Sequence, residues 1–567
     1  MKLRCFARAA LQARPALFAV VLLLTAAAGP LRAQSTNSPE AEQLRREMRQ
    51  IQSDYEQKMQ ALEQRINALS GTNAAATPAT SAPPAAPTLQ SPPAGSAALA
   101  GQARSNSLVR ARAFARESFL ADTETAEYAR SITGSGPVKE RVEHMMNDFI
   151  DINGYFRAGY GKDDKGGPQV AFQAPGALSK YRLGNEAEDY GELAFGKNFY
   201  VPELFKLDAG ERTDGTPTGP IARVQARISI YNPYNSLQDN SGTQFGLPEA
   251  WGAVGNVFAA QPEMKFWAGI RYYRRYDIHI SDFFYYNMSG SGGGMEDLQL
   301  PFGKLALAWI GSGGQSGFSD LPAPDPDNKA GFSKANWDVR LYDVPVPLGK
   351  AEFGFVFANA TSGLDSNGNT EPSVNGWALT ALHLWDGETG SGNLNRFSLQ
   401  YGTGAAITFT SGFETVSLTN GVFIRPQTED SWRFRVTEHF IRNINEYFSI
   451  GPELLYQITE YRSQGGQVQW LSSGVRPIFY LNRYVNLAFE GGVDWVKDDG
   501  AQTSGYLYKL TLAPEVSMGN QFMSRPAIRA FVTYAHWANA FVGAVGGNDY
   551  ADDNEGLTYG IQMEAWW

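Results

Sequence analysis

The sequence predicts an all-β fold, a transmembrane antiparallel β-barrel preceded by a helical extension. Charged residues form 19% of the 567-residue chain, aromatic residues reach 13% and glycines number 59, which excludes a charge-rich disordered chain or a coiled-coil filament. After the first thirty residues, no apolar run has the length of a transmembrane helix. From about residue 149 onward, polar and apolar residues alternate in short segments, which is typical of barrel strands.

The net charge and the positions of the histidines argue against two classes of function. The net charge of −10 argues against a nucleic-acid partner. Five histidines lie on separate segments, without metal-ligand spacing or a nearby nucleophile motif: His144, His279, His383, His439 and His536. We therefore expect no catalytic residues, no metal and no cofactor, and we interpret His279 as a structural or loop histidine.

Residues 1–33 are predicted to form an export signal peptide. An apolar core spans 16–28, Ala33 offers a small residue for cleavage, and basic residues precede the core at Lys2, Arg4, Arg8 and Arg14. A retained membrane anchor is the alternative, but the apolar stretch is short for a bilayer about 30 Å thick. The single cysteine, Cys5, lies before this core. A chain cleaved after Ala33 would have neither disulfides nor thiolate chemistry.

Residues 34–70 are predicted to form a coiled-coil helix that begins near Ser38 and Pro39. Apolar residues follow at spacings of 4, 3, 4, 4, 3, 4 and 3: Leu44, Met48, Ile51, Tyr55, Met59, Leu62, Ile66 and Leu69. A lone amphipathic helix would show a similar pattern. Residues 71–103 form an Ala/Pro/Ser-rich linker, and 104–148 are a linker or helical segment of unknown role. The extension is expected in the periplasm, where the coiled coil could bind a partner.

Residues 149–567 carry the barrel pattern. Val224, Ile228 and Ile230 alternate with Arg223 and Arg227, so one face of the segment is apolar and the other polar. A soluble β-sandwich would alternate in the same way. Aromatic clusters favour the barrel, because these rings resemble an interfacial girdle: Tyr272, Tyr273, Phe283, Phe284, Tyr285, Tyr286, Trp566 and Trp567.

Three aromatic residues fall on the polar face, which would line the lumen of a barrel. Tyr155, Tyr190 and Trp566 share their parity with nearby charged residues, namely Arg157, Arg182, Glu188, Glu192 and Glu564. A sugar has apolar C–H faces and a rim of hydroxyls, so rings flanked by ionised groups suit it chemically. Each ring taken alone could instead be a filler that narrows the barrel.

Several segments, in order, resemble the maltoporin-type sugar porins. They are 154–159 (GYFRAG), 179–186 (SKYRLGNE), 267–269 (WAG) leading to 275–279 (RYDIH), 524–529 (SRPAIR) and 562–567 (QMEAWW). The N-terminal extension resembles that of the sucrose-porin branch. The resemblance implies a homotrimer of barrels with about 18 strands in a bacterial outer membrane. Roughly 420 residues would then leave about 23 for each strand and its connection.

The resemblance also implies a path for oligosaccharides. Tyr155, Tyr190 and Trp566 would form an aromatic slide, and a polar track would comprise Arg157, Arg182, Glu192, Arg275, Asp277 and Asp282. The chain departs from the family at other positions. Leu394 and Met523 stand at slide positions, Phe284 and Asn287 at the constriction, and Pro248 where an arginine is expected. Tyr234 and Phe245 are candidates for a further slide aromatic in the second external loop.

The predicted function is facilitated passive diffusion of maltodextrin-like or sucrose-like oligosaccharides across the outer membrane. A general or anion-selective porin is the main alternative, although its lumen should carry a ladder of basic residues without rings. An outer-membrane enzyme would need a Ser/His pair, but the five histidines lie on separate segments without a nearby nucleophile motif. The helical extension could also be the functional part, acting as a tether.

Overall fold

The computed structural model describes residues 150–205, 210, 218–233, 243–313, 333–364, 370–388, 390–412, 416–417, 423–424, 429–462 and 466–567. The predicted signal peptide, coiled coil and linker segments lie outside these residues, and so does Tyr234.

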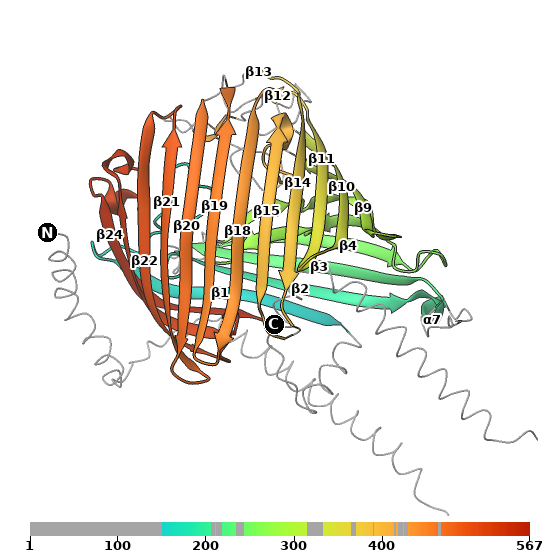
Figure 1. The fold of residues 1–567 in the computed structure, drawn as a ribbon, viewed down its shortest axis with the longest axis horizontal. Coiled ribbons are helices and arrows are strands. Elements are labelled where there is room, and N and C mark those ends of the chain that lie inside the picture. Colours follow the sequence, from blue (N-terminus) through green and yellow to red (C-terminus); the bar gives the residue numbers. More distant parts are fainter. Residues whose placement is uncertain are drawn as a thin grey trace, which may run out of the picture. The chain divides into compact units, whose positions relative to one another are not determined.

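Eighteen antiparallel strands close into one barrel, which confirms the predicted fold class (Figure 1). In chain order they are β1 (Asp151–Asp163), β2 (Glu188–Tyr200), β3 (Ile221–Pro233), β4 (Gln244–Gly255), β5 (Lys265–Arg271), β8 (Gly290–Leu300), β9 (Gly303–Gly313), β10 (Ser333–Val346), β11 (Gly349–Ala360), β14 (Val374–Asp386), β15 (Leu394–Thr403), β18 (Trp432–Asn445), β19 (Phe448–Glu460), β20 (Gln467–Tyr480), β21 (Val485–Asp498), β22 (Thr503–Ser517), β23 (Ala527–Trp537) and β24 (Glu555–Trp566). Each pairs with its neighbours in this order, and β1 closes the ring by pairing with β24, Tyr155 opposite Trp566. Closure leaves no sheet edge unpaired within the bilayer.

Shorter elements lie in the connections between these strands. Helix α7 (Val201–Phe205) follows β2. Three small two-stranded sheets pair β6 (Arg275–Ile278) with β7 (Phe283–Asn287), β12 (Gly363–Leu364) with β13 (Thr370–Glu371), and β16 (Val416–Ser417) with β17 (Phe423–Ile424). The β6–β7 hairpin is the one that shapes the site.

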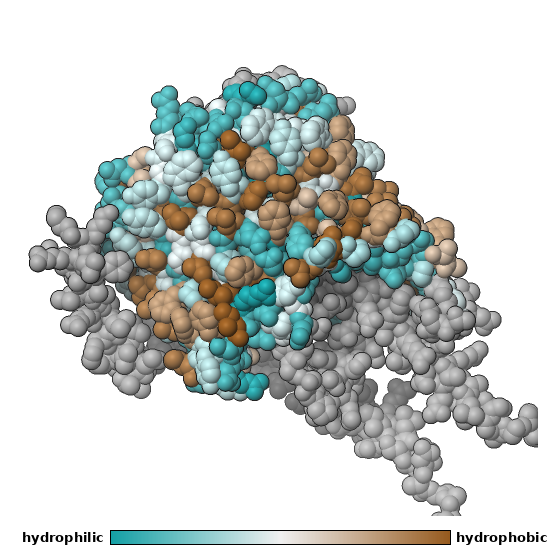
Figure 2. Space-filling view, in the orientation of Figure 1, coloured by the Kyte–Doolittle hydropathy of each residue, from teal (hydrophilic) through white to brown (hydrophobic). Residues whose placement is uncertain are grey.

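The two faces of the wall follow the alternation that the sequence predicts. On β3, Val224 is 51% exposed on the outer face, whereas Arg223 and Arg227 are buried on the inner face. Strand β24 repeats this pattern, with Ile561 exposed and Glu564 buried. Figure 2 shows apolar side chains spread over the middle of the visible wall and polar ones gathered at its upper edge. An apolar outer face and a polar lumen are the arrangement of a barrel in lipid.

The two ends of the barrel differ in their connections. Tight turns join β8 to β9, β10 to β11 and β18 to β19 at the end where β1 begins and β24 finishes. Longer connections, such as 164–187 and 538–554, lie at the opposite end. In outer-membrane barrels short turns face the periplasm and long loops face the exterior, which orients the chain.

The aromatic girdle is built from residues other than those predicted for it. A row of neighbouring outward rings crosses β9 to β18: Trp309, Trp337, Phe357, Trp377, Tyr401 and Trp432. Of the eight predicted girdle residues, Trp567 is exposed, whereas Tyr273, Tyr285, Tyr286 and Trp566 are buried. The prediction was wrong for most of the set because 272–286 is an inward-folded connection, where strand parity does not apply.

The connection between β5 and β8 crosses the lumen and is anchored on several wall strands. The Tyr276 hydroxyl donates to Glu352 of β11 at 2.6 Å, and Ser281 donates to Glu453 of β19 at 2.6 Å. Arg435 of β18 donates to the Tyr285 carbonyl at 2.8 Å. Charge-assisted hydrogen bonds of this kind hold the hairpin in place.

The connection 164–187 also folds inward. The Leu183 amide donates to Glu490 of β21 at 2.9 Å, and Lys509 of β22 donates to the Leu183 carbonyl. A Cβ atom on either Gly474 or Gly492 would lie 2.1 Å from the Tyr181 ring, so these two glycines leave the space that the ring fills. The Arg182 amide donates to the Ile280 carbonyl at 3.0 Å, so the two inward segments meet.

Candidate functional site

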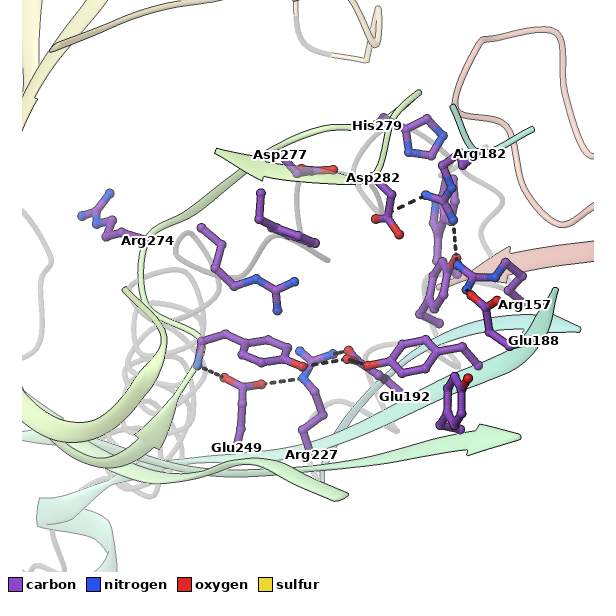
Figure 3. A pocket seen from close by; sticks show the side chains of 17 residues that line it. Arg157, Arg182, Glu188, Glu192, Arg227, Glu249, Arg274, Asp277, His279 and Asp282 are labelled. Carbon is purple, nitrogen blue, oxygen red and sulfur yellow. Dashed lines mark hydrogen bonds and ion pairs between the residues drawn. The ribbon is translucent and has the colours of Figure 1, made fainter. Parts of the chain in front are cut away.

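A pocket of about 400 Å³ lies between the barrel wall and the two inward segments (Figure 3). Its lining comes from β1, β2, β3, β4 and β24, from the connection 164–187 and from the β6–β7 hairpin with the residues before it. The lining residues are Tyr155, Arg157, Arg182, Glu188, Tyr190, Glu192, Arg227, Tyr231, Glu249, Tyr272, Arg274, Arg275, Asp277, His279, Asp282, Phe284 and Trp566.

The three predicted slide rings meet on one side of this pocket. Tyr155 and Trp566 have nearly parallel planes, at 11°, with centroids 6.3 Å apart. Tyr190 lies 6.1 Å from Tyr155 and is tilted to it by 52°. The Arg525 guanidinium lies 4.3 Å from the centre of the Trp566 ring and contributes a cation–π contact. Because β1 pairs with both β2 and β24, residues distant in the sequence become neighbours.

Glu564 joins this aromatic group to the charged network. Its carboxylate accepts from Arg182 at 2.9 Å and from the Tyr155 hydroxyl at 3.2 Å. Arg525 and Arg529 also pair with it, at 2.7 and 3.1 Å. Three arginines and one phenol on a single buried carboxylate hold the slide rings, the connection 164–187 and the β22–β23 turn together.

The connection 164–187 supplies further charges near the slide. Arg157 pairs with Glu186 at 2.6 Å and with Glu188 at 2.5 Å. Burial raises the pKa of Glu186, and the adjacent Arg157 and Arg182 oppose that shift. In these pairs each buried charge is compensated by an opposite one. The arginine and carboxylate groups still place hydrogen-bond donors and acceptors around the cavity.

His279, at the tip of the hairpin, is neutral near pH 7. Burial lowers its pKa well below the usual value, and Arg182 lowers it further, while Glu564 opposes the shift. Its ring meets Trp566 edge-on, with centroids 5.9 Å apart. This geometry supports the interpretation of His279 as a structural loop histidine.

A second network links β2, β3 and β4 to Tyr272 along the pocket. Arg227 donates to Glu249 at 2.6 Å and to Glu192 at 2.9 Å. Glu192 also accepts from the hydroxyl groups of Tyr190 and Tyr272. The guanidinium of Arg275 lies 3.9 Å from the Tyr272 ring centre.

Ten of the thirteen predicted binding residues line this one pocket. They are Tyr155, Tyr190, Trp566, Arg157, Arg182, Glu192, Arg275, Asp277, Asp282 and Phe284. The other three do not line it. Leu394 packs against the core at the start of β15, Met523 is buried in the β22–β23 turn, and Asn287 bridges to Thr410. Phe245 is 74% exposed on β4. The roles of all thirteen in transport stay predictions.

Seven lining residues are absent from the predicted set: Glu188, Arg227, Tyr231, Glu249, Tyr272, Arg274 and His279. Alternation already places Arg227 on the polar face of its strand and gives Glu188 the parity of Tyr190, although neither was among the expected binding residues. Tyr272 and Arg274 follow the end of β5 in an irregular connection, so their direction had no periodic signal.

Within the described part of the chain, no group of three or more His, Cys, Asp and Glu side chains could hold a metal ion. Nor does the same part contain a helix both long and apolar enough to cross a membrane.

The model of the family described as LamB porin matches residues 150–567. This chain belongs to the LamB porin family. The match covers the whole described barrel, from the residue before β1 to the last residue. As a LamB porin with a closed 18-stranded barrel, the protein is an outer-membrane diffusion channel, and its fold and family are those of a channel rather than an enzyme.

Solved porin structures resemble the chain more distantly. OmpT of Vibrio cholerae is 9% identical with a TM-score of 0.32, covering 74% of this chain and 97% of that one. The anion-selective porin from Comamonas acidovorans is 12% identical with a TM-score of 0.34, covering 73% and 99%. The Salmonella typhi OmpF complex with daunomycin is 10% identical with a TM-score of 0.37, covering 73% and 97%.

Proposed function

We propose that this LamB porin conducts oligosaccharides by facilitated passive diffusion, along an aromatic slide and a polar track. The observation that carries the proposal is the single pocket that combines Tyr155, Tyr190 and Trp566 with ionised donors and acceptors. Sugar rings can pack their C–H faces on the aromatic planes while their hydroxyls bond to the charged rim.

The charge of the pocket supports a neutral polar substrate. Five arginines and five acidic residues line it, so the formal charges balance. An anion-selective pore would concentrate one sign of charge to attract its substrate. A pocket with balanced charges attracts neither anions nor cations strongly, but it offers many hydrogen-bond donors and acceptors to hydroxyl groups.

The energetics of passage favour several weak contacts over one strong site. Each ring contact contributes on the order of 1 kcal/mol, so a sugar can exchange one contact for the next at little net cost. Conduction needs binding that recruits sugar and still releases it. Leu394 and Met523 do not line this pocket, which favours a short stretch of stacking and sucrose-like or short maltodextrin-like substrates.

Sugar block of the ion current in planar bilayers tests the proposal. Tyr155→Ala should weaken block by maltotriose or sucrose about fivefold, the equivalent of about 1 kcal/mol, with little change in open-channel conductance. The matched control is Tyr160→Ala, because Tyr160 lies on the same strand and is 55% exposed on the outer face. Equal block in the parent and Tyr155→Ala pores would contradict the slide. A parent pore that no sugar blocks would favour a general diffusion porin.

We also propose that the channel is a homotrimer in the lipid of the outer membrane, with its extension in the periplasm. The family resemblance supports the trimer, and the outward rings of β9 to β18 support lipid contact on that side. The mass of the purified complex in detergent checks the assembly. Deleting residues 34–102 and measuring sugar flux separates the pore from any tether to a periplasmic partner.

A further inference from the structure

Tyr272 lies where the barrel wall meets the β6–β7 hairpin. It directly follows β5 and leads towards β6, and both its backbone and its side chain contact pocket groups. The Tyr272 amide donates to Glu249 at 3.2 Å, and its hydroxyl donates to Glu192 at 2.7 Å. The residue is therefore held at two points on the wall, which orients its ring.

The carboxylate that accepts from Tyr272 also belongs to the slide. Glu192 accepts from the Tyr190 hydroxyl through the same oxygen and from Arg227 through the other. Arg227 lies 5.1 Å from the Tyr272 ring centre as well. A single acidic residue thus ties a slide ring to Tyr272.

The ring of Tyr272 contacts Arg275, an arginine of β6 that lines the pocket. The Arg275 guanidinium lies 3.9 Å from the Tyr272 ring centre and 4.1 Å from that of Phe284. A guanidinium is planar and carries its N–H donors at its edge, so rings packed on its faces leave the donors directed sideways. These two rings restrict the rotation of the group and fix the direction of its donors.

We propose that Tyr272 is a positioning residue that orients Arg275 towards sugar hydroxyls, and so sets the sugar selectivity of the channel. This inference rests on the sugar-conducting function proposed above. Phe284 acts as the second support of the same guanidinium. Its aromatic face contacts the guanidinium, with the ring centre 4.1 Å away.

A double-mutant cycle tests whether Tyr272 acts through Arg275. The variants are Tyr272→Leu, Arg275→Gln and their combination, each measured by maltotriose block of the ion current. Each single change should weaken block about fivefold, as expected for loss of a contact near 1 kcal/mol. The double variant should also be weakened about fivefold rather than about 25-fold, because coupled residues are not additive.

Tyr231 provides the matched control pair. It is a tyrosine that lines the same pocket from β3. The effects of Tyr231→Leu and Arg275→Gln should therefore multiply, as independent sites do. If they are as coupled as Tyr272 and Arg275, the coupling reflects the pocket as a whole and the inference is overturned.

Tyr272→Phe separates positioning from general packing. This variant keeps the ring on Arg275 and loses the hydroxyl bond to Glu192, so maltotriose block should stay within about twofold of the parent. If Tyr272→Leu does not insert into bilayers, Tyr272→Phe still tests the proposal through maltotriose block. Block as weak in Tyr272→Phe as in Arg275→Gln would overturn the inference.

The two proposals fail in different ways. If maltotriose and sucrose both fail to block the parent pore, the sugar-channel function is wrong. If the parent is blocked but the effects of Tyr272→Leu and Arg275→Gln multiply, the channel proposal stands and the positioning role is wrong.

Discussion

The side chains on the two sides of the pocket are oriented in different ways. The slide side comes from regular strands β1, β2 and β24, where Tyr155, Tyr190 and Trp566 point inward by strand parity. The other side comes from the β5–β8 connection, where Tyr272 is held by Glu192 of β2 and the Arg275 guanidinium packs against the rings of Tyr272 and Phe284. A strand side chain is directed by its own backbone, whereas a loop side chain is directed by its partners.

The first prediction breaks the ion-pair network at Glu564 of β24, on the strand-built side, and its effect should be the largest. Glu564→Gln removes the carboxylate shared by Arg182, Arg525 and Arg529, all of them buried. Uncompensated buried charge costs about 3–5 kcal/mol. Denaturant unfolding of the protein in detergent should show this loss in the free energy of unfolding. Glu555→Gln, at an exposed position of the same strand, should change it by less than about 0.5 kcal/mol.

The second prediction tests the direction of the strand side chains. Phe355 lies near the middle of β11 and is 42% exposed on the outer face. Phe355→Arg should lower the free energy of unfolding in lipid vesicles by about 2–4 kcal/mol, because a charge on the lipid face must be dehydrated. Phe355→Leu keeps the surface apolar and should cost less than about 1.5 kcal/mol. Parent-like stability of the arginine variant would contradict the assigned outer face.

The third prediction concerns the hairpin and should have the smallest effect. His279 in the hairpin has a pKa well below its usual range because it is buried near Arg182. Below pH about 6.5, His279 binds a proton in the unfolded chain but not in the native chain. The free energy of unfolding therefore falls as the pH falls. Between pH 7 and pH 5, His279→Phe should lose about 2 kcal/mol less of the free energy of unfolding than the parent. Equal pH dependence in the two proteins would show that the native histidine titrates normally.

Alternation along a strand predicts which side chains point inward, but not which of them line the pocket. The inward direction of Arg157 and Tyr190 followed from alternation along their strands, and the 18-stranded barrel agrees with the family resemblance. Arg227 follows the same rule, but so does Arg223, which pairs with Asp151 and does not line the pocket. Choosing between them requires the register between strands.

The aromatic run 272–286 shows where prediction failed. Its rings look alike in the sequence, and a lipid girdle and a packed lumen hairpin both require aromatic residues. Contacts of this segment with wall strands, such as those of Tyr276 with Glu352 and of Arg340 with Tyr286, show that it turns inward.

By itself, the sequence determined the alternating wall and the inward direction of Tyr155, Tyr190 and Trp566, because each follows locally from a backbone period of two. The tertiary structure alone decided which charges share Glu564 and which rings support Arg275. The Arg182–Glu564 pair joins residues 382 positions apart. The rings on Arg275 lie in an irregular hairpin connection, so neither set of contacts leaves a periodic trace in the chain.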